Sequence, residues 1–256
     1  MKRVAIVGGA GRMGQILAHG LGAQPDLQVT ALVDVHEPAP FEGARYAQRV
    51  EDLDPSSVDV VVDFSSPEGV GATARWCGEH AVALVVGTTG LDATHRQALD
   101  EASKTAAIVL AANFSLGAVL SERFAAQAAP YFERVEVIEL HHDKKVDAPS
   151  GTSIAAVNAI VDARRGAGLE PIVEPTTRYT LEGARGADAG DGVRVHSVRL
   201  PGLVAHQEIL FSGPGEGLTI RHDSFDRESY VPGVALAIRS MPSAPGLTIG
   251  LGSFVE

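Results

Sequence analysis

The sequence predicts an α/β protein with a doubly wound parallel sheet and a second α+β domain built on a mixed sheet. In the first half of the chain, short β-branched runs alternate with helical patterns, which is typical of βαβ units. In the second half this alternation stops and several amphipathic strands follow one another, which favours antiparallel or mixed pairing. A chain of 256 residues, 45% of them apolar, can bury the cores of two modest domains.

The predicted strands of the first half are short apolar runs, most of which should be buried on both faces. They are Val4–Val7, Val29–Val33, Val58–Phe64, Ala83–Val86 and Ala107–Ala111. A helical pattern over Gln15–Leu21 follows the first strand. Later helices are expected to begin after the N-cap residues Ser66, Asp92 and Ser115.

The second half begins and ends with a predicted helix. In chain order its elements are a helix over Leu116–Ala129, a strand over Arg134–Leu140, a helix over Thr152–Arg165, strands over Val193–Leu200, Ala205–Phe211 and Gly217–Arg221, and a helix over Tyr230–Met241. Pro232 stands in the first turn of the last helix, where proline is tolerated. The Gly- and Asp-rich stretch Glu182–Gly192 is predicted to be a mobile loop.

Charge and cysteine content argue against several classes of protein. The net charge of −11 is unsuited to a nucleic-acid partner, because binding to a phosphate backbone requires a basic face. No apolar run has the length of a membrane span, and glycines interrupt the apolar start, which we interpret as a strand and not a signal peptide. A single cysteine, Cys77, excludes an internal disulfide and favours the cytoplasm.

The strongest motif directly follows the first predicted strand. It consists of Gly8, Gly9, Ala10, Gly11, Arg12, Met13 and Gly14. It fits G-x-x-G-x-x-G from its first glycine and G-x-G-x-x-G from its second, and a helical pattern follows. Such glycines let the backbone approach a pyrophosphate, whose charge meets the N–H groups at the start of the helix. A plain strand-to-helix turn is the alternative, but the full fingerprint favours a Rossmann-type dinucleotide site.

An acidic residue stands where the ribose of such a cofactor would lie. Asp34 follows the second predicted strand, and a carboxylate there accepts hydrogen bonds from ribose hydroxyls. A strand-end turn or cap is the alternative role. No arginine follows Asp34, so we expect NADH to be the better or equal cofactor. Arg12 is either a solvated cation at the helix start or a phosphate contact that partly restores NADPH use.

Two further strand ends are candidates for lining the nicotinamide, because ligands of doubly wound sheets bind at the carboxyl ends of the strands. Taken alone, each would be an ordinary strand-end turn. The candidate residues are Gly87, Thr88 and Thr89 after one strand and Ala111, Ala112, Asn113 and Phe114 after the other.

The densest group of titratable residues follows the predicted strand Arg134–Leu140. It includes His141, His142 and Lys145, and it runs into Ser150, Gly151 and Thr152, which open a helix. Bare N–H groups and hydroxyls at a helix start suit an anion, and the loop suits an acidic substrate with an atom to protonate. The alternative is a solvated loop with Ser150 as an ordinary N-cap. Adjacent histidines lack the i, i+4 spacing of a helical zinc site, so we expect no metal.

These motifs together resemble the 4-hydroxy-tetrahydrodipicolinate reductase family, and the likeness covers nearly the whole chain. It rests on Gly8-x-x-Gly11-Arg12-Met13-Gly14, Gly87-Thr88-Thr89-Gly90, Ala112-Asn113-Phe114-Ser115 and Glu139-x-His141-His142-x-x-Lys145-x-Asp147-Ala148-Pro149-Ser150-Gly151-Thr152. The last motif is close to diagnostic. The resemblance implies NAD(P)H-dependent reduction of 4-hydroxy-tetrahydrodipicolinate, or dehydrated dihydrodipicolinate, to tetrahydrodipicolinate in diaminopimelate and lysine biosynthesis.

The resemblance also implies roles for individual residues. His141 would act as an acid or polarise the substrate, and Lys145 would donate a proton. The substrate carboxylates would be held by His142, Lys145, Ser150, Gly151 and Thr152. Residues 1–113 with 223–256 would form the dinucleotide-binding domain, and residues 114–222 the domain for substrate binding and assembly into a homotetramer. Lys144 stands where some relatives carry histidine.

Two other functions remain open from the sequence alone. A different two-domain NAD(P)-dependent dehydrogenase would share the glycine fingerprint but has no need of the His-His-x-x-Lys group. Aspartate-semialdehyde dehydrogenase would need a nucleophilic cysteine, whereas Cys77 lies in an apolar helical pattern that favours a buried thiol. A non-catalytic NAD(H) sensor is the third reading, against which the titratable loop argues.

Overall fold

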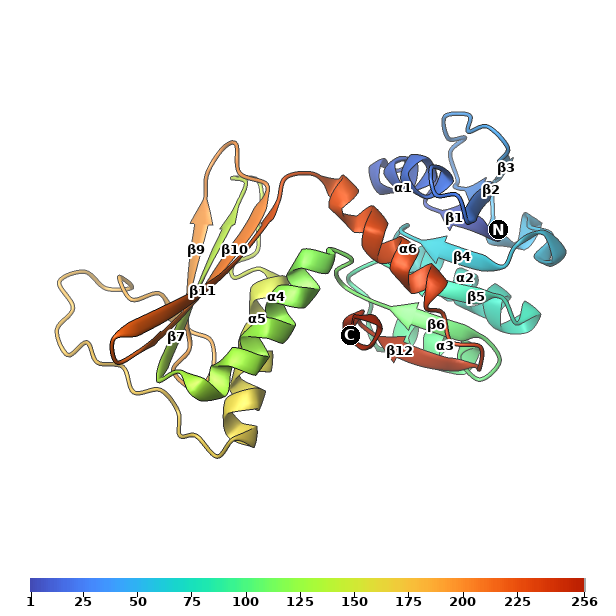
Figure 1. Cartoon of the computed structure of the whole chain (residues 1–256). Coiled ribbons are helices and arrows are strands. Elements are labelled where there is room, and N and C mark those ends of the chain that lie inside the picture. The colour runs from blue at the N-terminus through green and yellow to red at the C-terminus, as the bar shows by residue number, and fades with distance from the viewer. Residues whose placement is uncertain (256) are drawn as a thin grey trace. The chain divides into compact units, whose positions relative to one another are not determined.

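The computed structural model describes residues 1–255, so the last residue of the predicted segment 223–256 lies outside the described residues. The chain divides into two compact units. The first unit comprises Met1–Leu116 and the chain from Arg227 onward, and the second comprises Gly117–Asp226. Each unit has its own sheet, helices and buried apolar core (Figure 1).

The sheet of the first unit has seven parallel strands in the order β12-β6-β5-β4-β1-β2-β3. The strands are β1 (Lys2–Val7), β2 (Leu27–Val33), β3 (Arg45–Ala47), β4 (Val60–Asp63), β5 (Ala83–Val86), β6 (Ala107–Leu110) and β12 (Gly246–Ile249). From the central β1, the chain first moves outward through β2 and β3, and then crosses to β4 and moves outward on the other side. The predicted doubly wound sheet is confirmed, with its switch point between β1 and β4.

Helices pack on this sheet in two pairs: α1 (Arg12–Gly22) lies beside α6 (Val231–Arg239), and α2 (Pro67–His80) beside α3 (Ala93–Ala102) (Figure 1). Asp92 caps α3 as predicted, by accepting hydrogen bonds from the amides of Thr94 and His95 at 2.9 and 3.0 Å. Ser66 occupies the N-cap position of α2, but its side chain makes no capping hydrogen bond, so that prediction is only half right.

The last helix, α6, packs closely against the rest of the first unit. A Cβ added to Gly233 would lie 1.9 Å from the carbonyl oxygen of Phe114, so glycine allows α6 to approach the strand-end segment after β6. Arg239 at the end of α6 donates hydrogen bonds to both carboxylate oxygens of Asp26, at 2.7 and 2.8 Å. Within residues 1–255, no helix has the combination of length and apolar character that crossing a membrane demands.

The second unit is a mixed five-stranded sheet in the order β11-β10-β7-β9-β8, as the sequence predicted. Its elements are α4 (Leu116–Ala128), β7 (Arg134–His141), α5 (Gly151–Gly166), β8 (Ala187–Asp188), β9 (Arg194–Arg199), β10 (Ala205–Gly213) and β11 (Glu216–Ser224). The strands β7 and β9 are parallel, and the other pairs are antiparallel. Apolar residues of α4 and α5 form one core with those of β7, β9 and β10.

Three strands were not predicted, and all lie at edges of the two sheets: β3, β8 and β12. The predicted mobile loop Glu182–Gly192 contains β8, so that prediction is wrong at Ala187–Asp188. These short segments lack a clear two-residue periodicity, and they become strands because a neighbour, such as β9 for β8, supplies the hydrogen-bond partners.

Candidate active site

The glycine-rich motif forms a tight turn from β1 into α1. Gly8 has φ of +85°, and a Cβ there would lie 2.6 Å from the carbonyl oxygen of Phe64. Both the backbone angle and this close contact therefore require glycine at position 8. A Cβ on Gly14 would lie 2.1 Å from the carbonyl oxygen of Gly8. Arg12, Met13 and Gly14 are the first residues of α1, where amides have no intrahelical acceptor. The turn therefore presents backbone N–H groups to an anion.

Asp34 lies against this turn, directly after β2. Its Oδ2 accepts a hydrogen bond from the amide of Ala10 at 3.0 Å, and its Oδ1 accepts one from the amide of His36 at 3.1 Å. The structure thus brings the acid to the glycine-rich motif, and it also gives Asp34 the turn-forming contact that was the alternative reading. Arg12 is exposed and forms no ion pair with any residue from 1 to 255.

A buried polar cluster closes the switch point beside the turn. Asp63, the last residue of β4, is fully buried, and its Oδ1 accepts hydrogen bonds from the hydroxyls of Ser65 at 2.7 Å and Thr88 at 2.8 Å. Its Oδ2 is buried without a hydrogen-bond partner among the described residues. An acceptor left unsatisfied in a protein interior is costly, so this oxygen is an unsatisfied polar position at the carboxyl edge of the sheet.

Two aromatic rings shape the neighbouring strand ends. A Cβ on Gly87 would lie 2.2 Å from the ring of Phe64, which itself packs on Phe114 with ring centroids 5.3 Å apart. Thr88, Ala111 and Phe114 are buried, whereas Thr89 and Ala112 are exposed. The side chain of Asn113 accepts a hydrogen bond from the amide of Ser115 at 2.9 Å. All the predicted cofactor residues thus lie at the carboxyl edge of one sheet.

In the second unit, His141 is the last residue of β7, and its Nδ1 is hydrogen-bonded to a carboxylate oxygen of the fully buried Glu139. Burial would raise the pKa of Glu139, but hydrogen bonds, above all from Arg199, outweigh it and hold this pKa below its ordinary value. Burial lowers the pKa of His141 despite the nearby carboxylate. At neutral pH, Glu139 is therefore an ionised acceptor, and His141 is a neutral ring with its proton on Nδ1.

Lys145 lies in the loop after β7, and its side chain is 20% exposed. Its Nζ donates to both carboxylate oxygens of Asp147, each at 2.8 Å. This contact holds the pKa of Asp147 below its ordinary value, so this carboxylate is ionised at neutral pH. An ammonium group has three donors, so Lys145 keeps at least one N–H for a ligand. His142 and Lys144 are exposed beside it.

The start of α5 follows this loop. Ser150 is buried and is the N-cap, since its hydroxyl accepts a hydrogen bond from the amide of Ser153 at 3.2 Å. The Ser153 hydroxyl in turn donates to Oε1 of Gln207 at 2.6 Å. The ordinary capping role considered for Ser150 is therefore present. Gly151 and Thr152 are the first two residues of α5, where the amides point out of the helix start.

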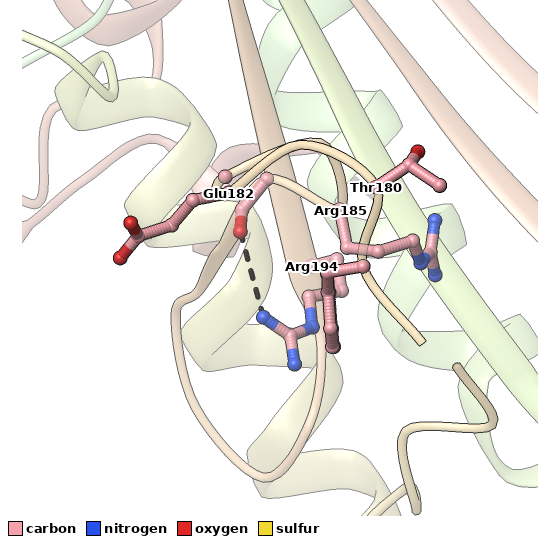
Figure 2. A pocket seen from close by; sticks show the side chains of 7 residues that line it. Thr180, Glu182, Arg185 and Arg194 are labelled. Carbon is pink, nitrogen blue, oxygen red and sulfur yellow. Dashed lines mark hydrogen bonds between the residues drawn. The ribbon is translucent and has the colours of Figure 1, made fainter. Parts of the chain in front are cut away.

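Two hollows lie in the second unit. One, of about 450 Å³, is lined by Tyr179, Thr180, Glu182, Gly183, Arg185, Gly186 and Arg194 (Figure 2). Its cations are already paired, because Arg185 contacts Glu136 and Glu174, and Arg194 contacts Glu174. The other, of about 510 Å³, reaches Ala148 and Pro149. Only the second therefore adjoins the predicted substrate loop.

Other chemistries find less support in the structure. No group of three or more His, Cys, Asp or Glu side chains is placed to hold a metal ion within the part of the chain that the structure describes. Cys77 is buried in α2, and burial raises the pKa of its thiol well above the ordinary value. A thiol of this kind is a structural residue and not a nucleophile.

Several site residues were given no role from the sequence. Asp63 and Phe64 end the predicted strand Val58–Phe64 and Ser65 follows it, and a carboxylate at the end of an apolar run was the available signal. Glu139 shares the inward face of β7 with Val135 and Val137. An acidic residue at an otherwise apolar position of this alternation was the signal that could have identified it. Arg199 had no local signal, because only the pairing of β7 with β9 brings it to Glu139.

Comparisons with known proteins cover almost the entire chain. Residues 2–114 match the family model described as Dihydrodipicolinate reductase, N-terminus, and residues 117–253 match Dihydrodipicolinate reductase, C-terminus. The 4-hydroxy-tetrahydrodipicolinate reductase of Nocardia farcinica is 47% identical over 260 residues, which cover 99% of this chain and 98% of that protein. The enzyme of the same name from Beutenbergia cavernae is 47% identical over 258 residues, with the same coverage.

A solved structure is also similar over its full length. It is the dipicolinate-bound dihydrodipicolinate reductase from Paenisporosarcina sp. TG-14, with a TM-score of 0.88 and 37% sequence identity, covering 99% of both chains. A match of this extent includes both sheets and the segments between them.

Proposed function

Because this chain belongs to the dihydrodipicolinate reductase family, we propose that it reduces 4-hydroxy-tetrahydrodipicolinate, or the dehydrated dihydrodipicolinate, to tetrahydrodipicolinate. It is an NAD(P)H-dependent oxidoreductase of diaminopimelate and lysine biosynthesis. The observation that supports the substrate most directly is the sequence of His141, Lys145 and the α5 start along one loop. A small heterocyclic dicarboxylate matches these donors, and the related reductase from Paenisporosarcina binds dipicolinate.

Cofactor binding and substrate binding would belong to different domains. Residues 1–113 with 223–256 would bind the dinucleotide, and residues 114–222 would bind the substrate and assemble a homotetramer. The glycine turn on the parallel sheet supports the first role, and the titratable loop on the mixed sheet supports the second. A chain with one cysteine also suits the reducing cytoplasm, where we place it.

Several features of the first unit support the binding of a nicotinamide dinucleotide. Gly8 and Gly14 let the turn pack closely on its own backbone and on that of Phe64, which brings its N–H groups together at the start of α1. Amides of Arg12 and Met13 at the start of α1 would hold the pyrophosphate, and Asp34 would hold the adenosine ribose. The strand ends at Gly87–Thr89 and Ala111–Phe114 would hold the nicotinamide. When bound in reduced form, this cofactor supplies the hydride.

The residues of the second unit would then bind the substrate and manage its protons. Lys145 would offer an N–H to a carboxylate or to the reacting system, while the Asp147 carboxylate accepts the other hydrogen bonds of its ammonium group. The amides of Gly151 and Thr152 and the exposed His142 would hold the carboxylates, with Ser150 fixing the helix start. His141 uses Nδ1 for its contact with Glu139, which leaves Nε2 for the substrate; once protonated, Nε2 could polarise or protonate the substrate.

The function is tested by following NADH absorbance at 340 nm while the upstream synthase supplies the heterocycle. We expect consumption of NADH that depends on the synthase product, and competitive inhibition against that product by pyridine-2,6-dicarboxylate. The inhibitor offers two carboxylates to Lys145 and the α5 start. A dehydrogenase for another substrate would ignore both compounds, and a non-catalytic sensor would bind NADH without consuming it. Competition with NADH alone would contradict the proposed substrate site.

Cofactor preference should depend on Asp34, whose charge would oppose the 2′-phosphate of NADPH. We propose NADH as the better or equal cofactor, with Arg12 offsetting part of the repulsion. Asp34→Ala should raise the KM for NADH and shift the ratio of kcat/KM values toward NADPH, by up to about tenfold, or about 1.4 kcal/mol. The shift should shrink at high salt, because Asp34 is only half-buried and salt screens its repulsion of the 2′-phosphate.

Asp34→Asn is the matched control, since the amide oxygen can still accept the hydrogen bond from Ala10. If the charge sets the preference, both variants shift the cofactor ratio in the same direction. If Asp34 only supports the turn, Asp34→Ala weakens both cofactors equally and Asp34→Asn changes neither. An unchanged ratio in both variants would remove Asp34 from the ribose site.

A further inference from the structure

We infer that Glu139 and Arg199 are positioning residues, which together hold His141 and the Lys145 loop in the arrangement that reduction requires. This inference rests on the proposed function, because it assigns to His141 and Lys145 the chemistry described above. Neither Glu139 nor Arg199 needs to touch the substrate; both act through their neighbours.

The contact between the two residues is bidentate. Nη1 of Arg199 donates to Oε2 of Glu139 at 2.8 Å, and Nη2 donates to Oε1 at 2.7 Å. The same Oε2 is hydrogen-bonded to Nδ1 of His141. A fork of this kind fixes the plane of the carboxylate, and the carboxylate then fixes the tautomer and ring orientation of the histidine. The Nε2 atom of His141 is thereby the one that is left for a ligand.

The fold supplies this geometry through strand pairing. The strands β7 and β9 are parallel, with His141 opposite Arg199 and Glu139 opposite Ser197. Arg199, at the end of β9, therefore contacts the buried carboxylate of Glu139, which lies two residues before its own partner His141 on β7. Glu139 is fully buried, so its charge needs the cation, and removing one partner of such a pair is far more damaging than weakening an exposed one.

The same guanidinium also holds the loop that carries Lys145. Nη2 of Arg199 donates to the backbone carbonyl of Asp147 at 2.7 Å, and the Asp147 carboxylate accepts both hydrogen bonds from Lys145. One side chain thus connects both proposed catalytic residues: it reaches His141 through Glu139 and Lys145 through Asp147. Changing Arg199 should therefore affect substrate affinity as well as turnover, whereas changing Glu139 should affect mainly turnover.

The charged groups around His141 predict the signs of a titration experiment. Glu139 on the same strand raises the pKa of His141, while Lys145 from the loop and Arg199 from β9 lower it along with burial. The other neighbouring strand, β10, places the uncharged residues Ala205 and Gln207 opposite His141 and Glu139. Loss of Glu139 should therefore lower the pKa of His141, and loss of Arg199 should raise it.

The chain contains its own control for these changes. Glu136, on the opposite face of the same strand, contacts Arg185, and its carboxylate lies 2.8 Å from Nε2 of His196, so it repeats the Arg-Glu-His combination on the other side of the sheet from His141. Glu136→Gln alters a comparable network on β7 without touching His141. It should leave the pKa of His141, the kcat and the substrate KM close to wild type.

The experiment compares Glu139→Gln, Arg199→Gln and Glu136→Gln by NMR titration of ¹³C-labelled histidine rings, with His141 assigned from His141→Asn. We expect the pKa of His141 to fall in Glu139→Gln and to rise in Arg199→Gln. In Glu139→Gln, kcat should drop about 10-fold to 100-fold, which is the usual effect of removing a group that hydrogen-bonds the second ring nitrogen of a functional histidine. The NADH dissociation constant should stay unchanged. In Arg199→Gln, the substrate KM should also rise.

Shifts of the same sign in both variants, no shift in either, or an equal loss of kcat in Glu136→Gln would overturn the inference. Where Glu139→Gln fails to fold, the rise in pKa and KM in Arg199→Gln decides it. A wild-type protein that does not consume NADH with the synthase product contradicts the proposed function, while the histidine titration still tests whether Glu139 and Arg199 control His141.

Discussion

Lys145→Ala should lower kcat by about 10²–10⁴-fold, the range typical of a positioned proton donor, while the dissociation constant for NADH stays nearly unchanged. The residue lies in the second unit, whereas the glycine-rich motif and Asp34 lie in the first, so the loss should not reach the dinucleotide. His141→Ala should behave in the same way. Steady-state kinetics measure the loss of kcat, and NADH fluorescence titration measures the dissociation constant of the cofactor.

Lys144→Ala is the matched control for this prediction. Lys144 is the adjacent lysine, is exposed, and forms no ion pair with residues 1–255, whereas Lys145 is held by Asp147. The control should keep nearly full kcat. Comparable losses in both lysine variants would point to the general charge of the loop and not to a proton donor, and weakened NADH binding in Lys145→Ala would contradict the proposed division of roles.

Gly14→Ala should nearly abolish NADH binding and lower the free energy of unfolding by about 1–3 kcal/mol, the usual cost of overpacking. The new Cβ would lie 2.1 Å from the carbonyl oxygen of Gly8 and 2.8 Å from Cα of Gly9. Both obstacles are backbone atoms of the turn, so the strand and helix must separate to accommodate the methyl group. The turn that would face the pyrophosphate is then distorted. Thermal unfolding and NADH titration measure the two effects.

The control for Gly14→Ala is the same substitution at Gly71, inside α2. There the nearest atom to a new Cβ is the flexible end of Arg75 at 3.7 Å. Alanine favours helix over glycine by about 0.5–1 kcal/mol, so Gly71→Ala should stabilise the protein and leave NADH binding unchanged. Opposite signs of the stability change in these two variants are the expected signature. Equal and small changes at both positions would mean that the turn tolerates a side chain.

Much of the first unit followed from local patterns. The strand Ala83–Val86 was predicted to the residue, and β1 and β2 within two residues, because apolar β-branched runs and glycine turns are local signals. Edge strands such as β12 escaped prediction. Gly246–Ile249 is a strand because its hydrogen bonds are supplied by β6, which lies far away in the sequence.

The candidate site shows the same division. His141, Lys145 and the α5 start form one continuous stretch of sequence, so a motif could identify them together. Asp34 was located by its place after β2, but its hydrogen bond to Ala10 depends on how that strand lies beside β1. The contacts of Asp63 could not be predicted without the folded sheet, because its hydrogen-bond partner Thr88 follows a different strand.

The sequence by itself determined the order of the α-helices and of the longer strands, the class of both sheets, the glycine turn and the titratable loop, since each depends on periodicity or on residues within one short segment. Only the tertiary structure decided which charges meet. Glu139 and Arg199 are ion-paired because β7 and β9 align in parallel, and this pairing sets the ionisation of Glu139 and the tautomer of His141. Electrostatic interactions depend on distance and burial, which folding alone establishes.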